Sequence, residues 1–95
     1  MKIRFTPRAA ADLDHIFAYA AKENPRAAAD LVDKITVAVQ RLGRFPDLGH
    51  ATNPAGRQVV TVARTRYRVF YRVRENEVRI LTIRHTSRRP LRNAQ

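Results

Sequence analysis

Cysteine is absent from this chain of 95 residues, and glycine occurs only three times. Without cysteine the chain has no disulfide framework, no thiolate nucleophile and no cysteine-ligated metal site. Three glycines cannot build the glycine-rich loop that cradles phosphate groups in many nucleotide-binding proteins. No two histidines stand at the spacing of metal ligands. We therefore expect neither a metal site nor a cofactor.

Long apolar runs are also missing. No stretch approaches the ~18 consecutive apolar residues of a membrane helix, and Met1 to Phe5 lacks the apolar core of a secretory signal. With 44% hydrophobic and 28% charged residues, the composition is typical of a globular chain of one domain. We expect residues 1–95 to form a single cytoplasmic domain.

Negative charge is scarce in one half of the chain. The formal net charge is +11, of which residues 1–48 contribute +2 and residues 49–95 contribute +9. The second half holds eleven arginines, no lysine, and only Glu75 and Glu77 as acids. A guanidinium offers a rigid fork of donors that suits carboxylate and phosphate. Codon bias would explain arginine in place of lysine, but it does not explain the missing acids, so we infer a surface for an acidic partner.

Two amphipathic helices are predicted near the N-terminus. Thr6-Pro7 and Asn24-Pro25 each combine an N-cap residue with proline at the first helical position. Gly43 stands where the second helix is expected to end, as its C′ residue. The short connection predicts an antiparallel helical hairpin. The expected apolar stripes are Leu13, Ile16, Phe17 and Ala20 on the first helix, and Ala28, Leu31, Val32, Ile35, Ala38, Val39 and Leu42 on the second.

Strand patterns precede and follow this hairpin. They cover residues 2–5, 57–63, 67–74 and 77–85, with a proline- and glycine-containing loop over 45–56 and a two-residue turn at Glu75-Asn76. The order β-α-α-β-β-β predicts an α+β fold, in which the helical hairpin packs on one face of a mostly antiparallel sheet. The other sheet face is expected to stay partly open.

Arginines alternate along the strand at 67–74. Tyr67, Val69, Tyr71 and Val73 are expected on the apolar face, and Arg68, Phe70, Arg72 and Arg74 on the open face. Exposed charges also protect sheet edges from pairing with other chains. Like charges at alternate positions repel one another without a partner, however, and so we favour a binding role. The candidate binding residues are Arg64, Arg66, Arg68, Arg72, Arg74, His85, Arg88 and Arg89.

Catalytic signatures are weak. His85, where the last strand meets a basic tail, suits a general acid or base or a phosphate contact, but taken by itself we favour a local hydrogen bond that holds the tail. Tyr67 and Tyr71 are expected in the core with their hydroxyls reaching outward, rather than as a platform for base stacking. Asp12 and Asp14 are two apart on a helix and cannot face each other. No Ser-His-Asp set is present, and we expect no enzymatic activity.

Three motifs in order resemble the ParE toxins of the ParE/RelE superfamily of type II toxin–antitoxin systems. The opening Phe5-Thr6-Pro7-x-Ala9-x-x-Asp12-Leu13-x-x-Ile16-x-x-Tyr19 is similar to the start of that family. Tyr67 to Val73 is similar to its "YRVxYxV" strand, and Ile80 to Arg89 to its closing "IL-x-V-x-H-x-x-R" strand. The resemblance covers nearly the whole chain and implies the RelE-like fold that the patterns predict.

The resemblance also implies two alternative activities. RelE-type toxins are ribosome-dependent endonucleases that cut messenger RNA, and Arg68, His85 and Arg88 match part of their site. Val59 and Thr61 stand where those enzymes carry lysines, which leaves no clear base for the 2′-hydroxyl. This departure favours the ParE branch. That branch implies a non-enzymatic inhibitor of DNA gyrase, active in plasmid stabilisation and neutralised by a cognate antitoxin.

Two expectations about partners follow. Antitoxins of such systems typically carry a flexible, acidic C-terminal segment, which the basic half of this chain suits. A third alternative is a plain basic nucleic-acid-binding module, but the chain has no helix-turn-helix, RRM or zinc signature. We expect no sequence-specific contact with nucleic acid and no membrane partner.

Overall fold

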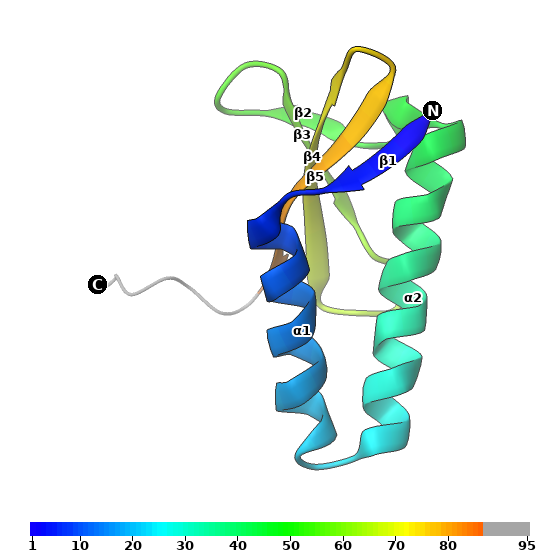
Figure 1. Cartoon of the computed structure of the whole chain (residues 1–95), viewed down its shortest axis with the longest axis vertical. Coiled ribbons are helices and arrows are strands. Elements are labelled where there is room, and N and C mark those ends of the chain that lie inside the picture. The colour runs from blue at the N-terminus through cyan, green and yellow to red at the C-terminus, as the bar shows by residue number, and fades with distance from the viewer. Residues whose placement is uncertain (87–95) are drawn as a thin grey trace.

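A computed structural model describes residues 1–86 of the chain. Its first half is a short strand followed by two long helices, and its second half is a sheet against which the helices pack (Figure 1). The elements are β1 (Lys2–Phe5), α1 (Pro7–Ala21), α2 (Pro25–Arg44), the 3-10 helix η1 (Pro46–Leu48), β2 (His50–Thr52), β3 (Arg57–Thr61), β4 (Tyr67–Arg74) and β5 (Glu77–His85).

The five strands form one sheet in the order β1-β5-β4-β3-β2. Only β1 and β5 run parallel; the other neighbours are antiparallel. The predicted α+β fold is therefore confirmed, as is the tight β4–β5 turn, where Glu75 and Asn76 both take positive φ values. The expected loop over 45–56 is wrong in part. It contains η1 and the short edge strand β2, whose three residues are too few to show an alternating pattern.

The helices begin as predicted. The Thr6 side chain accepts a hydrogen bond from the Ala9 amide, and the Asn24 side chain accepts one from the Ala27 amide, each at 3.1 Å. The expected end at Gly43 is wrong, because α2 continues to Arg44. A β-carbon at Gly43 would lie only 3.0 Å from the Met1 carbonyl oxygen. This glycine therefore brings α2 close to β1 instead of ending the helix.

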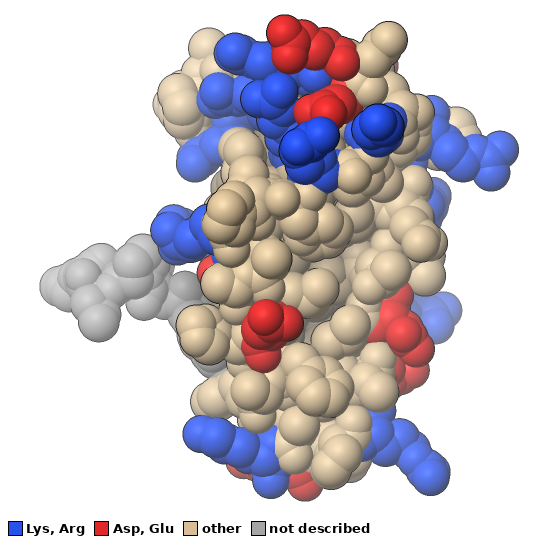
Figure 2. Space-filling model, in the orientation of Figure 1, with Lys and Arg blue, Asp and Glu red and all other residues tan. Residues whose placement is uncertain are grey.

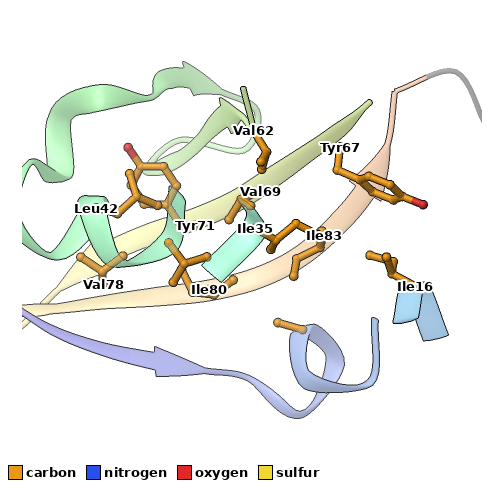
Figure 3. Close-up of a cluster of buried hydrophobic side chains, with 12 residues drawn as sticks. Ile16, Ile35, Leu42, Val62, Tyr67, Val69, Tyr71, Val78, Ile80 and Ile83 are labelled. Carbon is orange, nitrogen blue, oxygen red and sulfur yellow. The ribbon is translucent and has the colours of Figure 1, made fainter. Parts of the chain in front are cut away.

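The core lies between the helical hairpin and one sheet face (Figure 3). It confirms most of the predicted stripes, with Phe17 as an exception at 43% exposure. Helix α1 faces the sheet through its buried residues Ala9 and Ile16, and Phe17 lies just outside that line. The buried cluster is Ala9, Ile16, Ile35, Val39, Leu42, Val62, Tyr67, Val69, Tyr71, Val78, Ile80 and Ile83.

Tyr71 ties the sheet to the segment that follows α2. Its ring is fully buried and its hydroxyl points away from the core cluster (Figure 3). The hydroxyl accepts a hydrogen bond from the Gly49 amide at 2.9 Å and lies 2.7 Å from the Pro46 carbonyl oxygen, to which it donates. Burial raises the pKa of this phenol, as the largest cause. The expectation that the Tyr71 hydroxyl reaches outward is wrong, because Pro46 of η1, Gly49 and Gln58 of β3 surround it.

The first helix covers the edge of β5 where β1 ends. The Thr6 amide donates to the Ile80 carbonyl at 3.1 Å, which is the last backbone bond before the chain turns into α1. Beyond that point β5 has no neighbouring strand on this side within residues 1–86, and the Asp12 carboxylate accepts the hydrogen bonds of its edge. One of its carboxylate oxygens accepts hydrogen bonds from the Thr82 hydroxyl at 2.5 Å and from the Ile83 amide at 3.1 Å. Asp12 therefore satisfies an edge donor that would otherwise be buried without a partner.

Candidate functional site

Arginines from three strands meet on the sheet face turned away from the helices. Residues directly opposite each other on neighbouring strands project to the same face. Arg57 lies opposite Arg72, and Arg68 lies opposite Arg84, with Phe70 between these two rows. We call Arg57, Arg68, Phe70, Arg72 and Arg84 the arginine face.

Phe70 is the centre of the arginine face. The guanidinium carbons of Arg57 and Arg68 lie 5.0 Å and 5.7 Å from its ring centroid. These cation–π contacts cover the ring, which is only 9% exposed although it lies outside the buried cluster between the helices and the sheet. The Nε atoms of Arg57, Arg68 and Arg72 are buried and find no acceptor. Each such buried donor costs about 1–3 kcal/mol, so the face retains unused capacity to bind an acceptor.

The acids of the second half pair with the adjoining arginines of the same sheet face, Arg79, which lies directly opposite Arg72, and Arg4 beyond it. Glu77 lies 3.3 Å from the Arg4 Nε and 3.1 Å from the Arg79 Nε. The Glu75 carboxylate lies 3.4 Å from the Nη2 atom of Arg79. Figure 2 shows basic residues with acidic ones among them at the end of the molecule that holds β1 and the β4–β5 turn. Among residues 1–86, the four arginines of the arginine face have no carboxylate within ion-pair distance.

The ion pairs of Glu77 predict that part of the free energy of unfolding is lost at acidic pH. The hydrogen bond from Arg79, as the largest cause, holds the pKa of Glu77 below its ordinary value of 4.5. Such a group stabilises the fold above the ordinary pKa and loses this contribution as the pH falls through the folded pKa. In urea titrations, the difference between wild type and Glu77→Gln should be constant near neutral pH and shrink below pH 4.5. Glu75→Gln, at a highly exposed position, should show little difference at any pH.

The predicted site residues do not all fall on one surface. Arg68 and Arg72 belong to the arginine face. Arg64 and Arg66 lie exposed in the β3–β4 turn, where Arg64 takes a positive φ, and Arg74 is exposed at the end of β4. Arg88 and Arg89 lie outside the described residues. The structure therefore places Arg68, Arg72 and Arg74 on one sheet face, with Arg74 opposite Glu77, and leaves Arg64 and Arg66 in the turn outside it.

His85 projects to the helix side of the sheet. It lies opposite Tyr67, and the two rings pack edge to face with centroids 5.0 Å apart. The cause is a β-bulge: Tyr71 pairs with Ile80 and Phe70 pairs with Thr82, so Leu81 is an extra residue. Strict alternation along β5 would have placed His85 on the side of Arg68. The bulge reverses the parity, separates His85 from Arg68, and brings Arg84 to the arginine face.

Two members of the arginine face, Arg57 and Arg84, are absent from the sequence-based candidates. Arg57 was detectable, because pairing 57–61 with 68–72 across the predicted turn places it opposite Arg72. Arg84 was not, because its side depends on the bulge at Leu81. The alternation of apolar and polar residues along a strand does not predict the position of an extra residue in it.

Two grooves border the helices. One, of about 540 Å³, lies between α1 and the end of β5, and Asp12, His15, Tyr67 and His85 are among its lining residues. The other, of about 420 Å³, lies between α2 and β3 and contains the exposed apolar side chains Val37 and Leu48.

Within residues 1–86, no group of three or more His, Cys, Asp or Glu could hold a metal ion. Over the same residues no helix is long and apolar enough to cross a membrane.

Comparisons with known proteins agree with this fold. The family described as "ParE toxin of type II toxin-antitoxin system, parDE" matches residues 3–90. The protein Y4kP of Sinorhizobium fredii (strain NBRC 101917 / NGR234), whose name assigns it to toxins, is 37% identical over 84 residues. That match covers 88% of this chain and 86% of Y4kP.

Solved structures are similar over comparable lengths. A chain of the chromosomal ParDE system of P. aeruginosa has a TM-score of 0.80 and 29% identity, covering 92% of this chain and 97% of its own. A chain of the RelBE2 toxin–antitoxin complex of Mycobacterium tuberculosis has a TM-score of 0.61 and 28% identity, covering 88% of each. The Staphylococcus aureus YoeB structure, at 20% identity and a TM-score of 0.59, shares the fold. This chain belongs to the ParE toxin family of the ParE/RelE superfamily and is the toxin of a type II toxin–antitoxin system.

Proposed function

We propose that this toxin acts in the cytoplasm by inhibiting DNA gyrase, without chemistry of its own, and that an antitoxin with an acidic C-terminal segment neutralises it. The observation that carries the choice of gyrase is the separation of Arg68 from His85. A ribonuclease of the RelE type needs a group that activates the 2′-hydroxyl close to one that stabilises the developing charge. Here the two candidates project to opposite faces of the sheet.

The neighbours of Arg68 on its own face also support the proposal. Thr61 lies directly opposite Arg68, and Val59 lies opposite Phe70. Neither side chain can serve as a general base at neutral pH. The arginine face can therefore bind an anion and stabilise charge, but it supplies no base to begin cleavage. A protein that only binds its target needs no such base.

The basic surface supports the antitoxin part of the proposal. The four arginines of the arginine face have no carboxylate partner within residues 1–86. A segment rich in Asp and Glu would supply those partners. We propose that a toxin and antitoxin pair of this kind maintains the plasmid or chromosomal locus that encodes it.

Induced expression without the antitoxin separates the two activities. We expect incorporation of labelled thymidine to fall first, with filamentous cells and a DNA-damage response, while incorporation of labelled methionine continues. The purified protein should inhibit the supercoiling of relaxed plasmid by gyrase. Arg68→Ala and His85→Ala test the alternative, because a RelE-type ribonuclease should lose activity in both. Early arrest of translation with cleavage of translated messenger RNA would overturn the gyrase proposal.

A further inference from the structure

The arginine face holds two pairs of directly opposed arginines without a carboxylate partner within residues 1–86, and Arg79, which lies opposite Arg72 on β5, is the adjoining arginine that does have one. Arg57 faces Arg72 across β3 and β4, and Arg68 faces Arg84 across β4 and β5. Like charges placed directly opposite destabilise a sheet. Glu77 and Glu75, the acids at this end of the molecule, are already paired with Arg4 and Arg79. The fold therefore maintains two sites of concentrated positive charge that its own described acids do not neutralise.

The distance between the two arginine pairs restricts the ligand. Arg68 and Arg72 are four residues apart on β4, which corresponds to about 13 Å along the strand. An extended peptide has the same repeat, so its side chains at i and i+4 point the same way about 13 Å apart. In an α-helix, residues i and i+4 are only about 6 Å apart along the axis. The arginine pairs are thus spaced for carboxylates on an extended segment.

The zone between the pairs is uncharged. Val59 and Phe70 lie side by side there on neighbouring strands. An extended ligand would place residue i+2 above this zone, where an apolar or small polar side chain can contact the flat guanidinium planes that cover Phe70. The ligand therefore has the pattern acid-x-uncharged-x-acid.

We propose that the arginine face binds an extended acidic protein segment that carries two carboxylates four residues apart. One carboxylate is bound by Arg68 and Arg84, the other by Arg57 and Arg72. Each carboxylate offers two oxygens to the forked donors of a guanidinium pair, none of which has a carboxylate partner within residues 1–86. The inference rests on the antitoxin part of the proposed function, and it is independent of gyrase.

Single-stranded nucleic acid fits this face less well. Proteins that bind single strands stack bases on exposed aromatic rings. The Phe70 ring is 9% exposed and is covered by two guanidinium groups, so it offers no surface for stacking. Phosphates could accept hydrogen bonds from the guanidinium groups, but the bases would gain no exposed aromatic ring, whereas carboxylates at the i and i+4 spacing match both arginine pairs.

The test uses two labelled peptides of identical composition. One contains Asp-Thr-Val-Thr-Asp between neutral flanks, and the other contains Thr-Asp-Val-Asp-Thr, with the acids two residues apart. We expect the full chain, titrated by fluorescence anisotropy at low salt, to bind the first peptide roughly tenfold more tightly than the second. Equal affinity for the two peptides would overturn the proposal, because net charge alone would then explain binding.

Substitutions locate the contact. Arg68→Gln and Arg72→Gln should each weaken binding of the first peptide roughly tenfold, whereas Arg26→Gln, an equal charge change on the exposed start of α2, should have less than about a twofold effect. Arg72→Lys keeps the positive charge but removes the forked guanidinium donors, and it serves as the control for folding. Its urea unfolding curve should match that of wild type, while its affinity for the first peptide should be lower. An Arg26→Gln effect equal to that of Arg72→Gln would contradict the proposed site.

A labelled thymidine oligonucleotide of six residues completes the test. If it binds more tightly than the first peptide and loses affinity on Arg72→Gln, the face recognises phosphate and the proposal fails. The gyrase assay measures a different property. A failure there leaves this titration unaffected, and a failure of the titration leaves the gyrase assay unaffected.

Discussion

Gly49→Ala is expected to lower the free energy of unfolding by roughly 3 kcal/mol or more. An alanine β-carbon would lie 2.6 Å from the Tyr71 hydroxyl oxygen and 2.7 Å from the Val59 carbonyl oxygen. The backbone of Gly49 is extended, so the conformation itself is open to alanine, and the cost is steric. Overpacking of this kind costs about 1–3 kcal/mol. Displacing the Tyr71 hydroxyl would also strand buried polar groups, at a further 1–3 kcal/mol or so.

Gly43→Ala is the matched control. Its β-carbon would contact the carbonyl of Met1, the residue before β1, at 3.0 Å and the side chain of Ile3 in β1, an edge strand of the sheet, at 3.2 Å. Alanine is favoured over glycine inside a helix by about 1 kcal/mol, which offsets this closer contact. Urea unfolding followed by circular dichroism should therefore place Gly43→Ala within about 1 kcal/mol of wild type. A Gly49→Ala midpoint equal to that of wild type would show that the close approach to Tyr71 is not required.

Asp12→Ala should cost about 2–4 kcal/mol of stability. The change removes the acceptor of both the Thr82 hydroxyl and the Ile83 amide, which lie at the otherwise unpaired edge of β5. A buried donor without an acceptor costs about 1–3 kcal/mol, and two are affected here. The ion pair of Asp12 with Arg8, at 3.5 Å, adds little because the Arg8 side chain is 65% exposed.

Two further variants identify the mechanism. Asp14→Ala changes the same residue type on the same helix at an exposed position, so it should shift stability by less than about 0.5 kcal/mol. Asp12→Asn keeps an oxygen acceptor and loses the charge, and its loss should fall between those of Asp14→Ala and Asp12→Ala. Equal losses for Asp12→Asn and Asp12→Ala would assign the role to the charge instead of the edge hydrogen bonds.

Much of the fold is predictable because the signals that specify it are local. Thr6 and Asn24, each followed by proline, determine where the helices begin, since capping depends on neighbouring residues. Alternation from Tyr67 to Arg74 specifies which side of β4 meets the core. Gly43 and Gly49 show the limit of such reasoning. Both are required by close contacts with residues far away in the sequence, and those contacts exist only after folding.

In the candidate site, too, some features follow from the sequence and others depend on folding. The sequence by itself determined that the second half is basic and that Arg68 and Arg72 share a face, because both properties follow from composition and from a period of two. Only the tertiary structure decided that Arg84 joins them and that His85 does not. The extra residue Leu81 in β5 reverses the alternation between Ile80 and Thr82. A bulge is a property of the pairing between two strands, and it leaves no period in either strand alone.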